Sequence, residues 1–139
     1  MNPEFIIHMI AKIHDQANKF LIKNLKAHNI AIAPSHGDVI GALCLKDEMT
    51  MSELAAYINK DKSTVTALVN KLVNLGYVEK NAAPDDNRVC LVSLKDKGKS
   101  IKPEILGISK RMRDKAYRNF TQKEKQMLME LLLKIHRNF

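Results

Sequence analysis

The sequence is poor in several residue types, and each scarcity excludes a class of protein. It has no tryptophan, four phenylalanines, three tyrosines and only two cysteines in 139 residues. Two cysteines make neither a disulfide framework nor a four-cysteine metal site. No apolar run approaches the roughly 20 residues of a membrane-spanning helix. With five glycines and four prolines the chain has no flexible linker. One compact domain, or one protomer of an intertwined dimer, is therefore expected.

Acidic residues are also in the minority, with 15 Asp and Glu against 23 Lys and Arg, which gives a net charge of +8. Such a surplus suggests a polyanionic partner. The whole surplus lies in residues 95–139, which hold 13 basic and five acidic residues. The first four residues lack the positively charged segment with which a secretory signal peptide begins, so we expect a cytoplasmic protein that does not associate with membranes.

Residues 50–75 indicate two helices joined by a turn. Thr50 and Glu53 form a T-x-x-E capping box for the first helix. Asp61 is a good N-cap for the second, over residues 62–75, and Gly76 supplies the left-handed residue that ends it. One apolar stripe follows the helical period along the second helix: Val65, Leu68, Val69, Leu72 and Leu75.

The opposite face of the second helix carries lysines and small polar side chains: Lys62, Ser63, Thr66, Ala67, Asn70, Lys71 and Asn74. Serine, threonine and asparagine reach base edges in the major groove of DNA, while lysine neutralises phosphate. Any solvated helix can carry such a face. The pattern alone supports DNA contact and simple solvation equally.

Two β-prone runs follow, residues 77–82 and 88–94, with a turn-rich spacer between them. A hairpin directly after a helix-turn-helix makes a winged helix. Asp86 is able to hold the guanidinium of Arg88 near the tip, and an arginine there suits the narrow minor groove of A/T-rich DNA. A surface ion pair that stiffens the turn explains the spacing equally well. Lys95, Lys97 and Lys99 are further phosphate candidates.

This pattern resembles the MarR family of bacterial winged-helix transcription regulators. The residues that carry the resemblance are Leu54-Ala55, Asp61 to Thr66, Leu68-Val69, Leu72, Leu75-Gly76-Tyr77-Val78, the D-x-R of Asp86 and Arg88, Leu91-Val92-Ser93-Leu94 and Gly98. A looser similarity extends over essentially all 139 residues. Two residues depart from the family pattern: Lys95 stands where a capping threonine is usual, and Ala67 where many members carry arginine.

The remaining chain predicts four more helices, over residues 4–28, 34–45, 96–120 and 121–136. A bend is expected in the third of these at Pro103 and Gly107, and Thr121 with Glu124 makes a second capping box. The expected fold is mainly α, a winged helix-turn-helix with six helices and a small β-hairpin wing. The first and last two helices carry more apolar surface than the reading head can cover, which predicts an intertwined homodimer.

We therefore expect residues 1–32 and 100–139 to form a helical dimerisation region. Residues 33–99, which we call the reading head, are the expected DNA-binding domain. For base readout we predict Ser63, Thr66 and Asn70, for phosphate or guanine Lys62 and Lys71, and for the minor groove Arg88, oriented by Asp86. A symmetric dimer reads two half-sites of double-stranded DNA roughly 34–36 Å apart, and the resemblance implies a pseudo-palindromic operator.

The resemblance also implies a pocket for a small effector, often an aromatic acid, between the dimer helices and the reading head. Ser35 and His36 fall where some relatives have Thr-His near that pocket, and a helix N-terminus favours an anion. A solvated histidine on a first turn is the simpler interpretation. No two of the five histidines have the i, i+3 or i, i+4 spacing of a metal site, so we expect neither a metal nor a cofactor.

The sequence thus predicts a DNA-binding transcriptional regulator, expected to be a repressor that a small ligand releases from its operator. One alternative is a winged-helix protein-interaction module, because residues 61–94 are neutral overall, with four basic and four acidic residues. Another is a thiol-based oxidant sensor that uses Cys44 or Cys90, although structural thiols are favoured. No nucleophile–base pair or phosphate-binding loop is present, so an enzyme is not expected.

Overall fold

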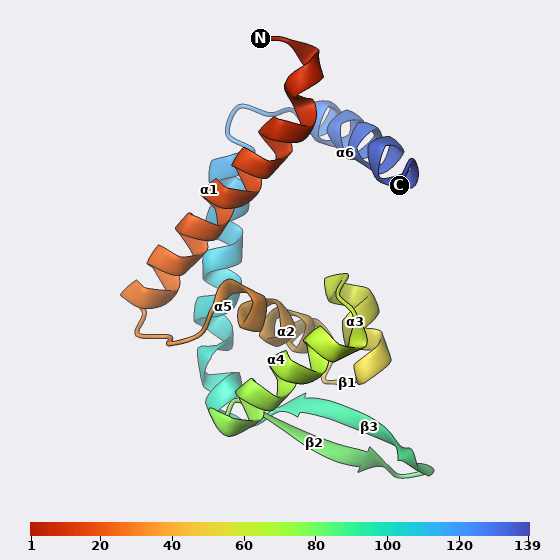
Figure 1. Ribbon diagram of the computed structural model, residues 1–139. Helices are drawn as coiled ribbons and strands as arrows, with labels where there is room; N and C mark the ends of the chain where they lie inside the picture. Colours follow the sequence, from red (N-terminus) through yellow and green to blue (C-terminus); the bar gives the residue numbers. More distant parts are fainter.

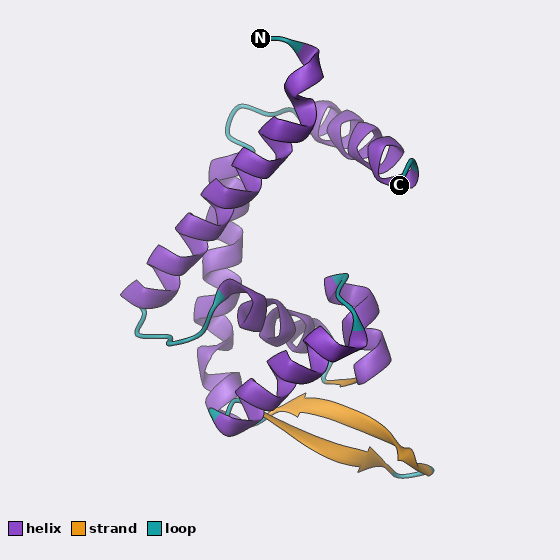
Figure 2. Cartoon of the chain, viewed as in Figure 1, coloured by secondary structure: helices purple, strands orange, loops and turns teal.

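The computed structural model describes all of residues 1–139 and is mainly helical, with one small sheet (Figures 1 and 2). The elements in chain order are a 3-10 turn at Pro3–Phe5, α1 Ile6–Ala27, α2 Pro34–Leu45, β1 Glu48–Thr50, α3 Met51–Ile58, α4 Lys62–Asn74, β2 Val78–Ala83, β3 Asp86–Leu94, α5 Asp96–Ala116 and α6 Gln122–Arg137. The predicted winged helix-turn-helix with six helices is confirmed. None of these helices combines the length and the apolarity that crossing a membrane requires.

The sheet has three antiparallel strands in the order β1-β3-β2, one more than the sequence predicts. The third strand, β1, is formed by the segment just before α3, for which the sequence predicts neither a helix nor a strand. Its residue Met49 pairs with Val92 of β3, and both side chains are buried. A three-residue strand is too short to show a periodicity. It forms because the open edge of β3 offers unpaired backbone groups to the passing chain.

The hairpin closes more tightly than predicted, over Pro84 and Asp85 alone. Ala82 pairs with Cys90, whereas Ala83 pairs with Asp86. Residues 87–89 of β3 are therefore extra residues without partners on β2, and they form a bulge. Bulges bend a strand and redirect its side chains, so this one sets the direction in which residue 88 projects.

The predicted N-cap and C-cap of α4 are both confirmed. Asp61 caps its start, because the Asp61 carboxylate accepts the backbone amide of Thr64 at 2.7 Å. Its end is a Schellman motif. Gly76 has φ +81°, and the amide of Tyr77 donates to the carbonyl of Leu72 at 2.9 Å. Short-range interactions thus fix both ends of this helix.

The other predicted helix signals have mixed outcomes. The capping box of Thr121 and Glu124 is complete, whereas only the Thr50 half of the first box forms. The carboxylate of Glu53 pairs instead with Lys46 from the end of α2. The helix that contains Pro103 continues past it, but ends at Ala116, four residues before the predicted end. Whether it bends at Pro103 stays a prediction.

The core lies between α2, α3, α4, the sheet, α5 as far as Ile108 and the C-terminal end of α1. It contains 18 buried apolar side chains, of which 14 belong to residues 33–99. Neither α6 nor the amino-terminal half of α1 has a buried residue. Figure 1 shows both of these segments at the end of the molecule opposite the wing, where they project away from the core.

Candidate nucleic-acid interface

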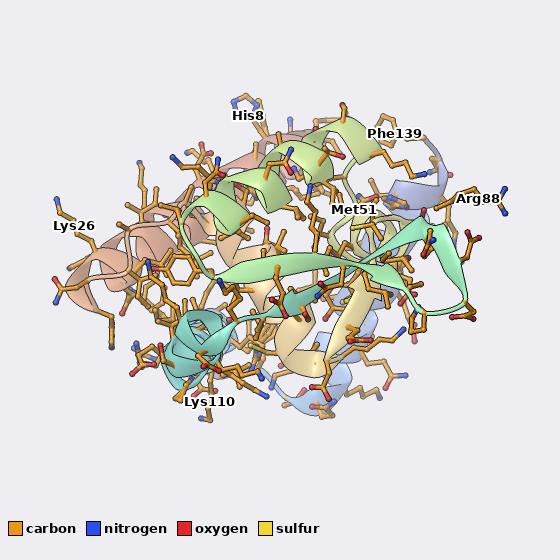
Figure 3. All side chains as sticks on the ribbon, turned by 90° about the horizontal axis from the view of Figure 1, so that it is seen from below. His8, Lys26, Met51, Arg88, Lys110 and Phe139 are labelled. Carbon is orange, nitrogen blue, oxygen red and sulfur yellow. The ribbon has the colours of Figure 1, made fainter.

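The recognition helix α4 and the wing lie side by side across one face of the molecule (Figure 3). Val65, Val69 and Leu72 of α4 are fully buried, and this apolar stripe fixes the rotation of the helix about its axis. The predicted DNA-contacting residues of α4 are all exposed on the opposite side: Lys62, Ser63, Thr66, Asn70 and Lys71. The structure therefore brings all five onto one accessible helix face.

Two of the predicted base readers already donate their hydroxyl protons within the chain. The hydroxyl of Ser63 donates to the carboxylate of Asp61 at 2.7 Å, and the hydroxyl of Thr66 donates to the carbonyl of Lys62 at 2.7 Å. The pKa of Asp61 is lowered, first by the backbone amide of Thr64 and then by the Ser63 hydroxyl. Both hydroxyls keep their lone pairs, so in this state they are acceptors.

The third predicted base reader, Asn70, has a partner that sequence reasoning missed. Its carbonyl oxygen Oδ1 accepts a hydrogen bond from Nζ of Lys80, on β2, at 2.8 Å. Strand alternation is the signal that could have found Lys80. It lies two residues after Val78, which is buried against the core, so both side chains leave the strand on the same side.

Arg88 projects from the bulge near the hairpin tip, and its side chain is 92% exposed. Figure 3 shows it pointing away from the body at the far end of the wing. Asp86 holds it as predicted: the carboxylate accepts the Arg88 backbone amide at 3.0 Å and the guanidinium Nε at 3.2 Å. These bonds, the backbone one foremost, lower the pKa of Asp86.

The ammonium of Lys97, predicted as a phosphate contact, is already engaged with the end of α4. Its Nζ donates to the carbonyl of Leu75 at 2.7 Å and lies 4.4 Å from the centre of the Tyr77 ring. Gly98 beside it is buried, and a Cβ at that position would lie 2.3 Å from the Tyr77 carbonyl oxygen. The first turn of α5 is therefore packed directly against the C-terminus of the recognition helix.

The two predicted effector contacts lie at the start of α2. Nδ1 of His36 accepts the backbone amide of Ala33 at 3.3 Å, so this histidine helps to cap the helix. Partial burial, and then the charge of Lys71, lower the pKa of His36. The neutral form that can accept this bond is thereby favoured. Ser35 is half-buried beside it.

A small cavity of about 80 Å³ lies between α1, α2 and α5. Ser35 and His36 are not among the residues that line it: Leu21, Leu25, Pro34, Gly37, Asp38, Ile105, Ile108, Ser109 and Met112. Partial burial raises the pKa of Asp38 at this cavity. Its volume is well below the roughly 300–1,000 Å³ of typical ligand pockets.

The two cysteines lie in different elements and are both half-buried. Cys44 packs against the core, and burial raises the pKa of its thiol despite the nearby charge of Lys102. A raised pKa means less of the nucleophilic thiolate. Cys90 lies on β3 in the wing. The environment of Cys44 is therefore that of a structural thiol.

In this structure two helices are joined by a turn, and the second helix buries one apolar stripe. A hairpin that carries an arginine follows them. This arrangement defines a winged helix-turn-helix protein. Residues 32–88 match the family model described as the MarR family. Over these residues the chain is similar to the MarR family, which confirms the resemblance predicted from the sequence. It is also 27% identical over 107 residues to YdgJ, an uncharacterised HTH-type transcriptional regulator of Bacillus subtilis strain 168. That match covers 77% of this chain and 65% of YdgJ, so the chain spans just under two thirds of that relative.

Solved structures have the same fold. A mutant of MarR from E. coli, complexed with operator DNA, aligns with a TM-score of 0.80 and 24% identity over 95% of both chains. BpsR of Bordetella bronchiseptica aligns with a TM-score of 0.80 and 15% identity, over 94% of this chain and 92% of BpsR. Its structure is described as showing a mechanism for regulation of DNA binding by 6-hydroxynicotinic acid.

Proposed function

We propose that the protein is a sequence-specific DNA-binding transcriptional regulator. The observation that carries this proposal is the single accessible face on which the polar side of α4 lies beside the arginine-bearing wing. A helix of this width fits the major groove of B-DNA. The wing is then the element next to the flanking minor groove. The solved structure of E. coli MarR with operator DNA, which has the same fold, supports this assignment.

Each predicted contact has a role in this proposal. Ser63, Thr66 and Asn70 contact base edges, while Lys62 and Lys71 contact phosphate or guanine. Arg88 enters the minor groove, where a narrow A/T-rich segment concentrates negative potential. Asp86 holds the arginine in place before binding, so less conformational freedom is lost when the complex forms.

The partner of the exposed apolar helices is a second copy of the chain. α6 has no buried residue, and large apolar side chains are exposed along it: Met127, Leu128, Met129, Leu131 and Leu133. A homodimer through residues 1–32 and 100–139 buries them and leaves two reading heads, residues 33–99, free to bind DNA. Two such heads fit a pseudo-palindromic operator with half-sites roughly 34–36 Å apart.

We further propose that the protein is a repressor released by a small aromatic acid. The DNA binding of the structurally similar BpsR is regulated by 6-hydroxynicotinic acid. Ser35 and His36 lie in the first turn of α2, where the positive end of the helix dipole favours an anion. The nearby cavity is too small for such a ligand in this state. Binding therefore requires α1 and α5 to separate from α2, which moves the reading head. Chromosomal DNA as the target implies a cytoplasmic location.

The proposal is tested by fluorescence anisotropy on duplexes from upstream of the protein's own gene. Arg88→Ala is expected to weaken binding at least tenfold, about 1.4 kcal/mol, with an unchanged melting temperature. Arg118→Ala, in the turn after α5 at the end opposite the wing, is the matched control and should have little effect. Unchanged affinity of Arg88→Ala at physiological salt would remove the wing from the mechanism.

One observation favours a second candidate, a winged-helix module that binds a protein. Residues 61–94 carry no net charge, whereas most DNA-binding surfaces are basic. The same titration separates the two functions when repeated over a range of salt concentrations. DNA affinity should fall steeply as salt rises, because bound counterions are released from phosphate. The absence of any DNA binding at low salt would favour the protein-binding module.

A further inference from the structure

A single side-chain to side-chain hydrogen bond joins the recognition helix to the wing. Nζ of Lys80 on β2 donates to Oδ1 of Asn70 on α4 at 2.8 Å. Both residues are exposed on the face proposed to meet DNA. Asn70 is one of the three side chains there with base-reading chemistry, and its partner arrives from a different element. Any DNA base that approaches Asn70 therefore meets Lys80 as well.

The backbone determines where Lys80 can reach. In the sheet, Lys80 pairs with Val92 of β3, and Val92 and Val78 are buried in the same core as the apolar stripe of α4. The Lys80 stem leaves the strand on that same side and extends along α4 to Asn70. An ammonium group has donors only, so the carbonyl end of the Asn70 amide must face it. The NH2 end then points away from Lys80.

This orientation changes what the asparagine can read. Asparagine by itself recognises adenine, because it accepts from the N6 amino group and donates to N7. Beside Lys80, the Asn70 carbonyl is occupied by a cation, and an adenine amino group would have to approach that cation. The pair instead offers the two amide protons of Asn70 and the two remaining protons of Lys80. Guanine presents two acceptors, O6 and N7, to such an edge.

We propose that Lys80 is a specificity-determining residue: together with Asn70 it forms a donor-only edge that selects guanine over adenine in the operator. The inference rests on the proposed DNA-binding function and deepens it. Nearer the start of the same helix, the hydroxyls of Ser63 and Thr66 donate into the chain and therefore present acceptors. The exposed face of α4 thus has these acceptors beside the Lys62 ammonium, and the donor-only pair of Asn70 and Lys80 lies further along it.

The test is selection from a randomised duplex library, followed by anisotropy titrations on the selected site and its guanine-to-adenine variants. The wild-type protein should favour guanine at one position in each half-site by roughly fivefold or more. Lys80→Met keeps the length of the stem and removes the ammonium, and it should abolish or reverse that preference at that position alone. Asn70→Ala should abolish the preference at the same position.

Lys99→Met is the matched control, since Lys99 is an exposed lysine just after the wing that is expected to contact phosphate alone. It should weaken binding to all sites by a similar factor and leave the base preference intact. A uniform loss for Lys80→Met would mean that Lys80 contacts phosphate only, and an unchanged profile would mean that its bond to Asn70 is not used. Either result overturns the inference and leaves the proposed function standing. If the wild-type protein selects no sequence at all, both fall.

Discussion

The reading head and the helices outside it differ in how completely one chain buries its apolar side chains. Of the 18 buried apolar residues, 14 lie in residues 33–99. Of the 17 large apolar residues that remain exposed, 15 lie outside that range. The reading head therefore buries most of its apolar side chains within one chain. The helices outside it can bury theirs only against another surface.

Helices α4 and α6 show the difference with the same local pattern. Each has a capped start and one apolar stripe at helical spacing. Leu72 on α4 is fully buried, whereas Leu131 on α6 is 54% exposed. An amphipathic period predicts that a stripe will be buried, but not which chain supplies the surface that covers it. Substitutions on the exposed stripe of α6 should therefore change the assembly of the protein, whereas substitutions in the reading head should change the stability of the single chain.

The largest expected effect comes from a charge placed on the exposed stripe. Leu131→Asp should raise the dissociation constant of the proposed homodimer at least a hundredfold, about 2.7 kcal/mol, because a carboxylate would be buried without a partner. Sedimentation velocity across a concentration series measures this. Tyr57→Asp, at an exposed apolar residue of the reading head, should leave the oligomeric state unchanged. A wild-type protein that stays monomeric at micromolar concentration would contradict the dimer.

Within the reading head, Gly98→Ala should lower the free energy of unfolding by about 2–3 kcal/mol. The added Cβ would lie 2.3 Å from the Tyr77 carbonyl oxygen and 2.9 Å from Leu94 Cδ2, so the start of α5 must shift away from α4. Urea unfolding measures the change. Gly41→Ala, where a Cβ meets nothing within 4 Å, should be neutral or stabilising. Equal effects of the two substitutions would show that this contact is not tight.

A smaller effect, this time a gain in the free energy of unfolding, is expected where the reading head joins α5. Lys95 is the N-cap of α5 and makes no side-chain capping bond. Lys95→Thr should stabilise the protein by about 0.5–1 kcal/mol, because a hydroxyl can accept an orphan amide of the first turn. Lys99→Thr, inside the same helix, removes a charge without adding a cap and should give no gain. Thermal unfolding of both variants at one pH compares them directly.

The smallest expected effect is a pH dependence at the start of α4. Hydrogen bonds lower the pKa of Asp61 in the folded protein. Its charge therefore contributes stability that is present above the ordinary aspartate pKa and is lost as pH falls through the lowered value. Asp61→Asn keeps an acceptor for the amide but has no charge to lose. Its melting temperature should lie below that of the wild type at pH 7, with a gap that narrows by pH 3. A constant gap would contradict this account.

Much of the reading head could be predicted because its signals are local. Asp61 and Gly76 cap α4 through residues within five positions, and Asp86 holds Arg88 across two. The DNA contacts assigned to this face stay predictions. The predicted hydrogen bond from the Glu53 side chain back to the start of its own helix is wrong, because Lys46, at the end of α2, pairs with that carboxylate.

Periodicity and capping depend on residues a few positions apart, so the amino-acid sequence was enough to predict the six helices, both caps of α4 and its polar face. Three features became visible only in the folded chain: the pairing of β1 with β3, the bond from Lys80 to Asn70 and the contact of Lys97 with Tyr77. These contacts join residues 10 to 45 positions apart, or elements that only the folded path brings together. No local pattern carries that information, because it depends on how the whole chain packs.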